Sequence, residues 1–432
     1  MSVFNRGDDG GIGRGERALL IVPDRAGHAG LRSIEARIEE AAGLAMAIGI
    51  DVVARRSYRV RQPRPSSLLG KGQVEEIAEI AEQHEARLLI VDAALSPVQQ
   101  KTLEEETKCK VIDRTGLILE IFGERAATAE GRLQVELAHL DYQAGRLVRS
   151  WTHLERQRGG FGFLGGPGET QIEADRRMIR DRMARIRREL EQVRRTRGLH
   201  RDRRQKAPWP VIALVGYTNA GKSTLFNRMT QASVMAEDLL FATLDPTMRQ
   251  VKIPGFDRAI LSDTVGFVSD LPTELVAAFR ATLEEVSAAD LILHVRDIAH
   301  EDSDAQAADV EAVLAALGLG EEDSPPRIEV WNKLDLIEQP ERGEILGEAQ
   351  RRIDVIAISA LTGEGIDQLR EAVAAELHAG GQTRRIRLNA GDGPRIAWLH
   401  ARGEILEQQM DGDQLHLAVK LSPENWARFD RL

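Results

Sequence analysis

Residues 216–224 read Gly-Tyr-Thr-Asn-Ala-Gly-Lys-Ser-Thr and complete the phosphate-loop pattern G-x-x-x-x-G-K-[ST]. An apolar run over 211–215 precedes the motif, and a helix-compatible stretch follows it. A strand, a tight glycine turn and a helix whose first N–H groups are free together form a cradle for phosphate. In this setting we expect Lys222 to bring positive charge to the β- and γ-phosphates and the Ser223 hydroxyl to reach Mg²⁺. The motif therefore predicts a nucleoside triphosphate site.

Three further motifs, each after an apolar run, indicate which triphosphate is bound. In Asp263-Thr-Val-Gly266 the carboxylate can bind Mg²⁺ through water, and the glycine N–H can meet the γ-phosphate. In Asn332-Lys-Leu-Asp335 the carboxylate can accept hydrogen bonds from N1–H and the exocyclic amine of guanine. Adenine lacks this pair of donors, so Asp335 predicts GTP. The backbone of Ser359-Ala-Leu361 can donate to the guanine oxygen. Each motif alone could be an ordinary loop cap, but the four in this order predict a GTP-binding domain.

The composition limits the class of protein. The chain has 432 residues, 42% of them apolar, which suits roughly three domains of about 150 residues. Cys109 is the only cysteine, which excludes a disulfide framework within the chain and a cysteine-rich metal site, and favours a reducing compartment. No apolar run approaches the ~18 residues of a membrane span. We therefore expect a soluble, cytoplasmic protein without a membrane span.

The order of apolar and helical stretches predicts the fold class, which is α/β. Between residues 18 and 113 short apolar runs alternate with helical stretches, which predicts a small α/β domain with a parallel sheet. The GTPase domain should have a mixed, mostly parallel sheet. The tail predicts a short α+β domain, with strands at 385–388 and 415–421 and a helix over 395–408. The predicted segments are a disordered N-terminus (1–16), the N-terminal α/β domain (17–127), a helical hairpin (128–206), the GTPase domain (210–378) and the C-terminal domain (384–432).

The hairpin is predicted from two segments with apolar residues at alternating steps of four and three, which is the spacing of a coiled coil. The first row is Leu133, Leu137, Leu140, Ala144, Leu147, Trp151 and Leu154, and the second is Ile179, Met183, Ile186, Leu190 and Val193. Residues 173–206 also carry 14 Lys/Arg and 6 Asp/Glu, a local charge of +8 in a chain of net charge −10. A solvated helix face is the simpler interpretation of this basic run, and a contact with nucleic acid is the alternative.

The loop that connects the two helices, residues 156–169, holds six glycines, two arginines and two phenylalanines. A plain helix connection needs only about 2–8 residues. Aromatic side chains stack on unpaired bases and arginines meet phosphates, so we favour an RNA-binding tip over a plain linker. The predicted RNA-binding residues of the loop and the basic helix are Arg156, Arg158, Phe161, Phe163, Arg177, Arg180, Arg187 and Arg188.

Residues 211–377, with the four motifs, resemble the G domains of the translation-factor-like class. The resemblance implies that Phe241-Ala-Thr-Leu-Asp245 is the first switch, in which Thr243 is the second Mg²⁺ ligand and γ-phosphate sensor. Thr247 competes for that role, since we expect it in the same mobile segment. The predicted catalytic residues are Lys222, Thr243 and Gly266, and the Mg²⁺ ligands are Ser223 and Thr243 directly and Asp263 through water. The predicted nucleotide-binding residues are Gly216, Tyr217, Thr218, Asn219, Ala220, Gly221, Lys222, Ser223, Thr224, Phe241, Ala242, Thr243, Leu244, Asp245, Asp263, Thr264, Val265, Gly266, Asn332, Lys333, Leu334, Asp335, Ser359, Ala360 and Leu361.

Two positions depart from or extend this pattern. Phe267 stands where many GTPases carry the glutamine that orients the attacking water, so we expect slow hydrolysis until a partner completes the site. Asn219 matches an asparagine with which potassium-dependent GTPases of this class bind K⁺ near the phosphates. The alternative role of Asn219 is a hydrogen bond that shapes the loop.

The order of the parts, with Arg158–Gln171 in the hairpin, the phosphate loop and Phe241–Asp245, resembles the HflX family over nearly the whole chain. This resemblance implies a monomeric GTPase that binds GTP and GDP with Mg²⁺, and a large ribosomal subunit contacted near the peptidyl-transferase centre. It also implies splitting of stalled or stressed 70S ribosomes. A role in large-subunit biogenesis, a switch acting on a protein effector and a GTP-binding scaffold with negligible turnover remain as alternatives.

Overall fold

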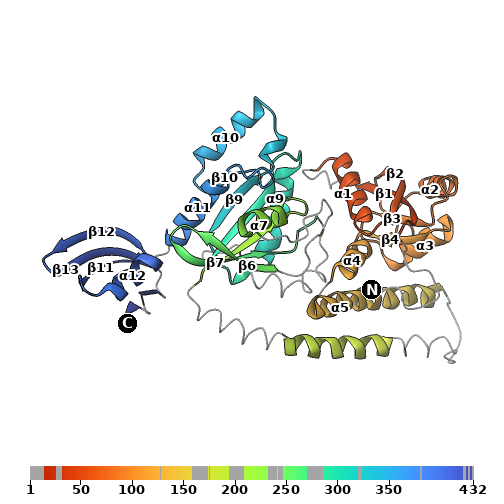
Figure 1. Cartoon of the computed structure of the whole chain (residues 1–432). Coiled ribbons are helices and arrows are strands. Elements are labelled where there is room, and N and C mark those ends of the chain that lie inside the picture. Colours follow the sequence, from red (N-terminus) through yellow and green to blue (C-terminus); the bar gives the residue numbers. More distant parts are fainter. Residues whose placement is uncertain are drawn as a thin grey trace. The chain divides into compact units, whose positions relative to one another are not determined.

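The computed structural model describes residues 14–25, 32–126, 128–157, 174, 176–193, 209–231, 241, 247–269, 286–319, 324–379, 382–421, 425–426 and 429–430 (Figure 1). These residues form two compact units. The first holds everything up to residue 193 together with Phe241 and Ser269, and the second holds the remaining described residues. The segment 1–13, most of the predicted disordered N-terminus, lies outside the described residues.

The first unit begins with a parallel four-stranded sheet of order β2-β1-β3-β4. Its strands are β1 (Arg17–Arg25), β2 (Asp51–Val60), β3 (Leu88–Val91) and β4 (Lys110–Asp113). The helices are α1 (Ile34–Ala47), α2 (Lys71–Gln83), α3 (Pro97–Thr107) and α4 (Arg114–Arg125). Residues 18–22 and 88–91 are fully buried, because helices cover both faces of a parallel sheet. The core on the side of α2 and α3 includes Ile21, Ile77, Leu89 and Leu103.

Helix α5 (Ala129–Gln157) follows and is tied to α4 by one carboxylate. Asp113, which is 1% exposed, caps α4 by accepting the N–H of Gly116 at 2.8 Å. It also accepts the hydroxyl of Tyr142 at 2.7 Å and the guanidinium of Arg146 at 2.8 Å, both from α5. Asp113 is therefore shared by the two helices and fixes the position of α5.

The second arm of the predicted hairpin is a helix over residues 176–193. Its buried side chains are Met183, Ile186 and Leu190, all from the predicted apolar row. Arg182 joins it to α5 through two hydrogen bonds to Glu136, of 2.7 and 2.9 Å. In α5 itself the most buried residues include Val135, Ala138 and His139, while Leu133, Leu137 and Leu140 of the predicted row are only half-buried. Helix α5 thus buries a second face that the heptad spacing did not predict.

The second unit is built on a six-stranded sheet of order β10-β9-β8-β5-β7-β6, in which β6 alone is antiparallel to its neighbour. The strands are β5 (Val211–Gly216), β6 (Thr247–Ile253), β7 (Phe256–Asp263), β8 (Leu291–Asp297), β9 (Arg327–Asn332) and β10 (Val355–Ala357). The helices are α7 (Lys222–Thr230), α9 (Ser303–Ala316), η1 (Leu334–Leu336), α10 (Glu341–Arg351) and α11 (Ile366–Ala379).

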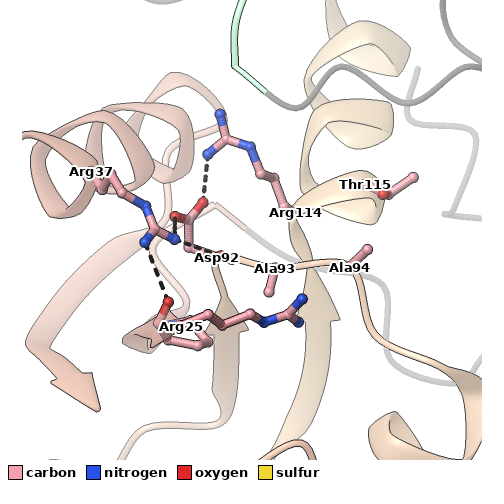
Figure 2. Close-up of a pocket in the computed structure, with 8 residues that line it drawn as sticks. Arg25, Arg37, Asp92, Ala93, Ala94, Arg114 and Thr115 are labelled. Carbon is pink, nitrogen blue, oxygen red and sulfur yellow. Dashed lines mark hydrogen bonds and ion pairs between the residues drawn. The ribbon is translucent and has the colours of Figure 1, made fainter. Parts of the chain in front are cut away.

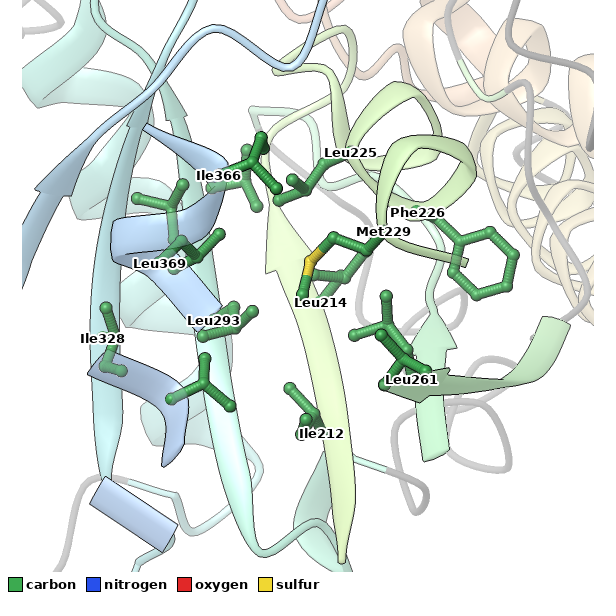
Figure 3. Close-up of a cluster of buried hydrophobic side chains, with 14 of the residues drawn as sticks. Ile212, Leu214, Leu225, Phe226, Met229, Leu261, Leu293, Ile328, Ile366 and Leu369 are labelled. Atoms are coloured by element: carbon green, nitrogen blue, oxygen red, sulfur yellow. The ribbon is translucent and has the colours of Figure 1, made fainter. Parts of the chain in front are cut away.

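The core of this sheet lies under α7 and α11 (Figure 3). Phe226 and Met229 of α7 and Leu369 of α11 pack with Leu214 and Leu293 of the strands, and all are almost completely buried. This packing fixes α7 at the carboxyl end of β5, which is where the phosphate motif leaves the sheet. The predicted fold class, a mostly parallel GTPase sheet after an α/β domain, is confirmed.

The C-terminal sheet is antiparallel, with order β11-β13-β12 and strands β11 (Gln382–Asn389), β12 (Glu404–Asp411) and β13 (Gln414–Leu421). The helix α12 (Gly393–Arg402) ends six residues before the predicted limit at residue 408. Gly403 follows it, and residues 404–411 pair with β13 instead, as in Gln408 with Leu417. The prediction of a helix through 408 is wrong because strand pairing outweighs the local helical pattern.

No helix among the described residues is long and apolar enough to cross a membrane.

Candidate nucleotide-binding site

The phosphate loop connects β5 to α7 through two glycines that no other residue could replace. Gly216 has φ 152°, and a Cβ there would lie 2.2 Å from the carbonyl oxygen of Val295. Gly221 has φ 91°, and a Cβ there would lie 2.2 Å from the side-chain nitrogen of Asn332. Both positive φ values and both close approaches require glycine. Asn219, also at positive φ, 60°, is exposed at the turn of the loop.

Lys222 lies beneath this loop and is 6% exposed. Its Nζ donates to the carbonyl oxygens of Gly216 at 3.0 Å and Tyr217 at 2.8 Å. Burial lowers the pKa of Lys222 to about 8, and the nearby carboxylate of Asp263 acts in the opposite direction. A bound anion, such as a phosphate group, would therefore stabilise the charged form of Lys222.

The oxygens expected to hold Mg²⁺ come from two elements. The Ser223 hydroxyl at the start of α7 donates to Oδ2 of Asp263, at the end of β7, at 2.8 Å. The next residue, Thr264, donates its hydroxyl to the carbonyl of Leu214 at 2.6 Å, which fixes the end of β7 to β5. Hydroxyl and carboxylate oxygens are hard ligands of the kind that Mg²⁺ prefers. The two oxygens fit such an ion with water completing its shell.

The residues after Asp263 lie on the phosphate loop. Phe267 forms an isolated parallel bridge with Tyr217: its N–H donates to Gly216 at 3.1 Å, and its carbonyl accepts the N–H of Thr218 at 2.7 Å. A Cβ on Gly266 would lie 2.8 Å from Cγ2 of Thr218 and 3.2 Å from Nζ of Lys222. The Phe267 side chain is 3% exposed. The backbone of Gly266 and Phe267 therefore closes directly over the loop.

The loops expected to hold the base form a second cluster at the ends of β9 and β10. The Ser359 hydroxyl donates to Oδ1 of Asp335 at 2.5 Å. Nδ2 of Asn332 donates to the carbonyl of Ala220 at 2.8 Å, and its Oδ1 accepts the N–H of Ala360 at 2.9 Å. Leu361 is 67% exposed. The structure brings Asn332, Asp335 and Ser359 together and joins them to the phosphate loop.

Asp297 at the end of β8 belongs to this cluster but was not predicted from the sequence. Its Oδ2 lies 2.7 Å from Nζ of Lys333, whose backbone has φ 68°. A carboxylate at the end of a strand next to β9 was the available signal, since the ends of neighbouring parallel strands meet at one edge. Asp297 is therefore an additional residue that fixes the base loop.

The predicted first switch is only partly described. Phe241 belongs to the first unit, where it is 2% exposed, and Ala242 to Asp245, including Thr243, lie outside the described residues. Thr247, the competing candidate, is the first residue of β6 and pairs with Asp263. It was expected in a mobile segment, but the register of β6 with β7 holds its backbone in the sheet.

Of the predicted RNA-binding residues, those of the second helix are described best. Arg177, Arg180, Arg187 and Arg188 are all exposed. Arg156 lies in the last turn of α5, and Arg158, Phe161 and Phe163 lie outside the described residues. The structure therefore leaves four arginines of one helix open to a partner. Among the described residues there is no group of three or more His, Cys, Asp or Glu that could hold a metal ion.

Four family models match the chain in succession. The model described as GTP-binding GTPase N-terminal matches residues 35–123, and GTP-binding GTPase Middle Region matches 125–204. The model described as 50S ribosome-binding GTPase matches 211–333, and HflX C-terminal domain matches 344–432. The order of the models follows the order of the structural parts.

Curated relatives match over most of their length. A protein of Magnetococcus marinus named GTPase HflX is 48% identical over 386 residues, which are 89% of this chain and 88% of the relative. GTPase HflX of Escherichia coli strain K12 is 43% identical over 393 residues, 91% of each chain. Among solved structures, a GTP-binding protein from Sulfolobus solfataricus in complex with GDP covers 84% of this chain and 99% of its own, at 23% identity and a TM-score of 0.44.

Proposed function

The chain belongs to the HflX family of GTPases, and from this premise we propose that it is a ribosome-associated GTPase that splits stalled or stressed 70S ribosomes. It hydrolyses GTP to GDP and phosphate, as members of this family do. The family model over 211–333 is described as a 50S ribosome-binding GTPase, which supports the large subunit as the partner. The observation that carries the proposal is the set of exposed arginines on the helix over 176–193, whose Met183, Ile186 and Leu190 are buried.

In the proposed hydrolytic site the ammonium group of Lys222 binds the β- and γ-phosphates, and the N–H of Gly266 binds the γ-phosphate. Asp335 accepts the two donors of guanine, and the backbone after Ser359 donates to its oxygen. Mg²⁺, held by Ser223, Thr243 and, through water, Asp263, would neutralise phosphate charge. Because the hydrocarbon side chain of Phe267 cannot form a hydrogen bond to the attacking water, the proposed site needs a further group to orient that water.

Phe267 supports a partner-dependent reaction in two ways. Its side chain has no polar atom, and it is buried rather than directed to solvent.

The exposed Asn219 has no hydrogen-bond partner among the described residues, so loop shaping by its side chain is not supported there. We propose that Asn219 helps to hold K⁺ beside the phosphates. Equal turnover in K⁺ and Na⁺ would exclude this role.

Binding to ribosomal RNA should depend on the exposed arginines. Each phosphate contact releases counterions, so affinity should fall steeply as salt rises. The side chains of Arg187 and Arg188 stand clear of the buried Ile186, so their replacement should leave the helix packed. The proposed loop contact at the peptidyl-transferase region adds Arg158, Phe161 and Phe163 to this surface.

The decisive experiment is sedimentation of the protein with 50S and 70S particles in the presence of a non-hydrolysable GTP analogue, at two salt concentrations. We expect co-sedimentation that weakens with salt and conversion of 70S particles to subunits. The double variant Arg187→Gln/Arg188→Gln should bind more weakly and show a smaller salt dependence. Its control is Arg249→Gln, an exposed arginine of β6. A failure to co-sediment would rule out the ribosomal proposal, and binding without splitting would leave subunit biogenesis as the better function.

A further inference from the structure

Arg114, the first residue of α4, bonds to three residues within the first unit. Its guanidinium pairs with Asp92 and Glu40. Figure 2 shows Asp92 between Arg114 and Arg37. All three residues line a cavity of about 200 Å³. Its Nη2, which pairs with Glu40, also donates to the carbonyl oxygen of Ser269 at 3.0 Å and to its Oγ at 2.7 Å. Arg114 is 5% exposed, so these bonds are shielded from water.

Glu40 completes the attachment of Ser269. The Ser269 hydroxyl donates to Oε1 of Glu40 at 3.0 Å, while Glu40 also pairs with Arg114. Nε of Arg114 adds a second contact to the Ser269 carbonyl at 3.3 Å. Ser269 is therefore held through both its carbonyl and its side chain by a buried ion-pair cluster. Charge-assisted hydrogen bonds of this kind are stronger than those between neutral groups.

The position of Ser269 in the chain gives this attachment its importance. It follows Gly266 by three residues, and Gly266 and Phe267 lie on the phosphate loop within the second unit. Gly266 sits against Thr218 and beside Nζ of Lys222. That is the side of the loop where, under the roles proposed above, the γ-phosphate binds. Residues 266–268 therefore lie beside the proposed place of the γ-phosphate, and the next residue is the one that Arg114 holds.

We infer that a bound γ-phosphate displaces residues 266–268, and that Arg114 is a positioning residue that weakens GTP binding relative to GDP because it holds Ser269 and so restrains these residues on the phosphate loop. If the restraint keeps residues 266–268 on the phosphate loop in most molecules, only the remaining fraction can bind GTP. The apparent GTP affinity is then the intrinsic affinity multiplied by that fraction. GDP has no γ-phosphate and does not need this movement. The effect should therefore fall on the triphosphate alone.

The same helix also contacts the predicted first switch. The Phe122 ring of α4 packs edge-to-face on Phe241, with ring centroids 4.5 Å apart. Phe241 is the first residue of the predicted first switch, and it belongs to the first unit together with Ser269. Helix α4 thus holds Phe241 of the predicted first switch as well as Ser269.

The test compares the affinities of the full-length protein for fluorescent GDP and for a fluorescent non-hydrolysable GTP analogue. Ser269→Ala removes the hydroxyl bonds to Arg114 and Glu40 without leaving a charge unpaired, and Arg114→Gln removes the ion pair as well. We expect Arg114→Gln to bind the analogue about 3- to 10-fold more tightly and Ser269→Ala, which keeps the carbonyl bonds, to show a smaller gain, with GDP affinity within about twofold of the original in both. The KM for GTP should fall by a similar factor while kcat stays unchanged.

Arg37→Gln is the matched control, since Arg37 also bonds to Asp92, at 3.2 Å, but has no contact with Ser269 among those the structure describes. It should change neither affinity, even if it lowers Tm. Arg114→Lys, which keeps a donor, should fall between Arg114→Gln and the original protein. Analogue affinity unchanged in both Ser269→Ala and Arg114→Gln, or GDP affinity raised equally, would overturn the inference. Failure of the original protein to bind either nucleotide would instead reject the proposed site.

Discussion

Asn332 joins the base end of the nucleotide site to the phosphate end, since its Nδ2 donates to the carbonyl oxygen of Ala220 at 2.8 Å. Its Oδ1 accepts the N–H of Ala360 at 2.9 Å, so one amide connects three loops. All these groups are buried, with Asn332 2% exposed. The amide therefore fixes the distance between the parts that bind guanine and phosphate before any nucleotide is present.

Replacement of Asn332 should weaken GTP and GDP binding to a similar extent. In Asn332→Asp the donor to Ala220 becomes an acceptor, so two oxygens face each other in a buried site. We expect a loss of about 2–3 kcal/mol in binding free energy for each nucleotide. Fluorescence titration with both nucleotides measures it. A loss of affinity for GTP alone would contradict the proposal that Asn332 fixes the distance between the guanine and phosphate ends of the site.

Replacement of Asp335 should change the choice of base. In Asp335→Asn the side chain loses one acceptor and gains a donor, so it no longer matches the two N–H groups of guanine and can match a base with oxygen at C2. We expect GTP affinity to fall by about 2 kcal/mol or more and xanthosine triphosphate affinity to rise. Competition binding between the two nucleotides tests this. Retention of guanine preference in the variant would remove Asp335 from the proposed base site.

Glu120 in α4 should make stability depend on pH. Burial raises its pKa to about 7, against the opposing charge of Lys110. The folded protein therefore holds this proton between pH 4.5 and about 7, where the unfolded chain releases it. The contribution of Glu120 to stability then falls as pH rises through that window. Glu120→Gln cannot ionise, so it should raise the free energy of unfolding by about 2 kcal/mol at pH 8 and by little at pH 4.5.

Glu75→Gln is the control for that experiment, because the side chain of Glu75 in α2 is 59% exposed and Glu75 does not contribute to the pKa shift of Glu120. Denaturant unfolding at pH 4.5 and pH 8 measures both variants. If Glu120→Gln raises the free energy of unfolding equally at the two pH values, removal of the Glu120 charge is not the cause of the stabilisation.

The helix over 176–193 should depend on Ile186. Its side chain is completely buried, with 0% exposed, and it belongs to the row that faces the rest of the first unit. Ile186→Ala should lower the stability of this helix by about 2–4 kcal/mol. Arg187→Ala at the next, exposed position should change stability by less than about 0.5 kcal/mol. Hydrogen exchange of amides 176–193 distinguishes the two, and equal protection in both variants would argue against packing of this helix.

The nucleotide motifs could be located from sequence because each follows a strand of one parallel sheet, and the carboxyl ends of such strands meet at one edge. Asp263, Asn332 and Ser359 therefore come together although they are far apart in the chain. Asp297 was missed because an acidic residue after a strand has no motif of its own. The bonds of Asn332 to Ala220 and Ala360 also depend on loop shapes that spacing does not determine.

The first unit shows where periodicity fails. Helix α4 was not predicted, because Leu117 to Phe122 are buried all around the helix and leave no polar stripe. Helix α5 was predicted from one apolar row, but Val135 and His139 bury a second face against the same unit. In the C-terminal domain residues 404–408 read as helix and pair as strand. In each case the burial or pairing is decided by a distant segment, which a local pattern does not contain.

Asp113 gives the first unit a mechanical property. One buried carboxylate holds both the N-terminus of α4 and, through Tyr142 and Arg146, the middle of α5. From Arg146 to the end of α5 at Gln157 the helix extends by roughly 16 Å, at ~1.5 Å per residue. A force on the C-terminal end of α5 would therefore act on Asp113, the residue that directly precedes Arg114.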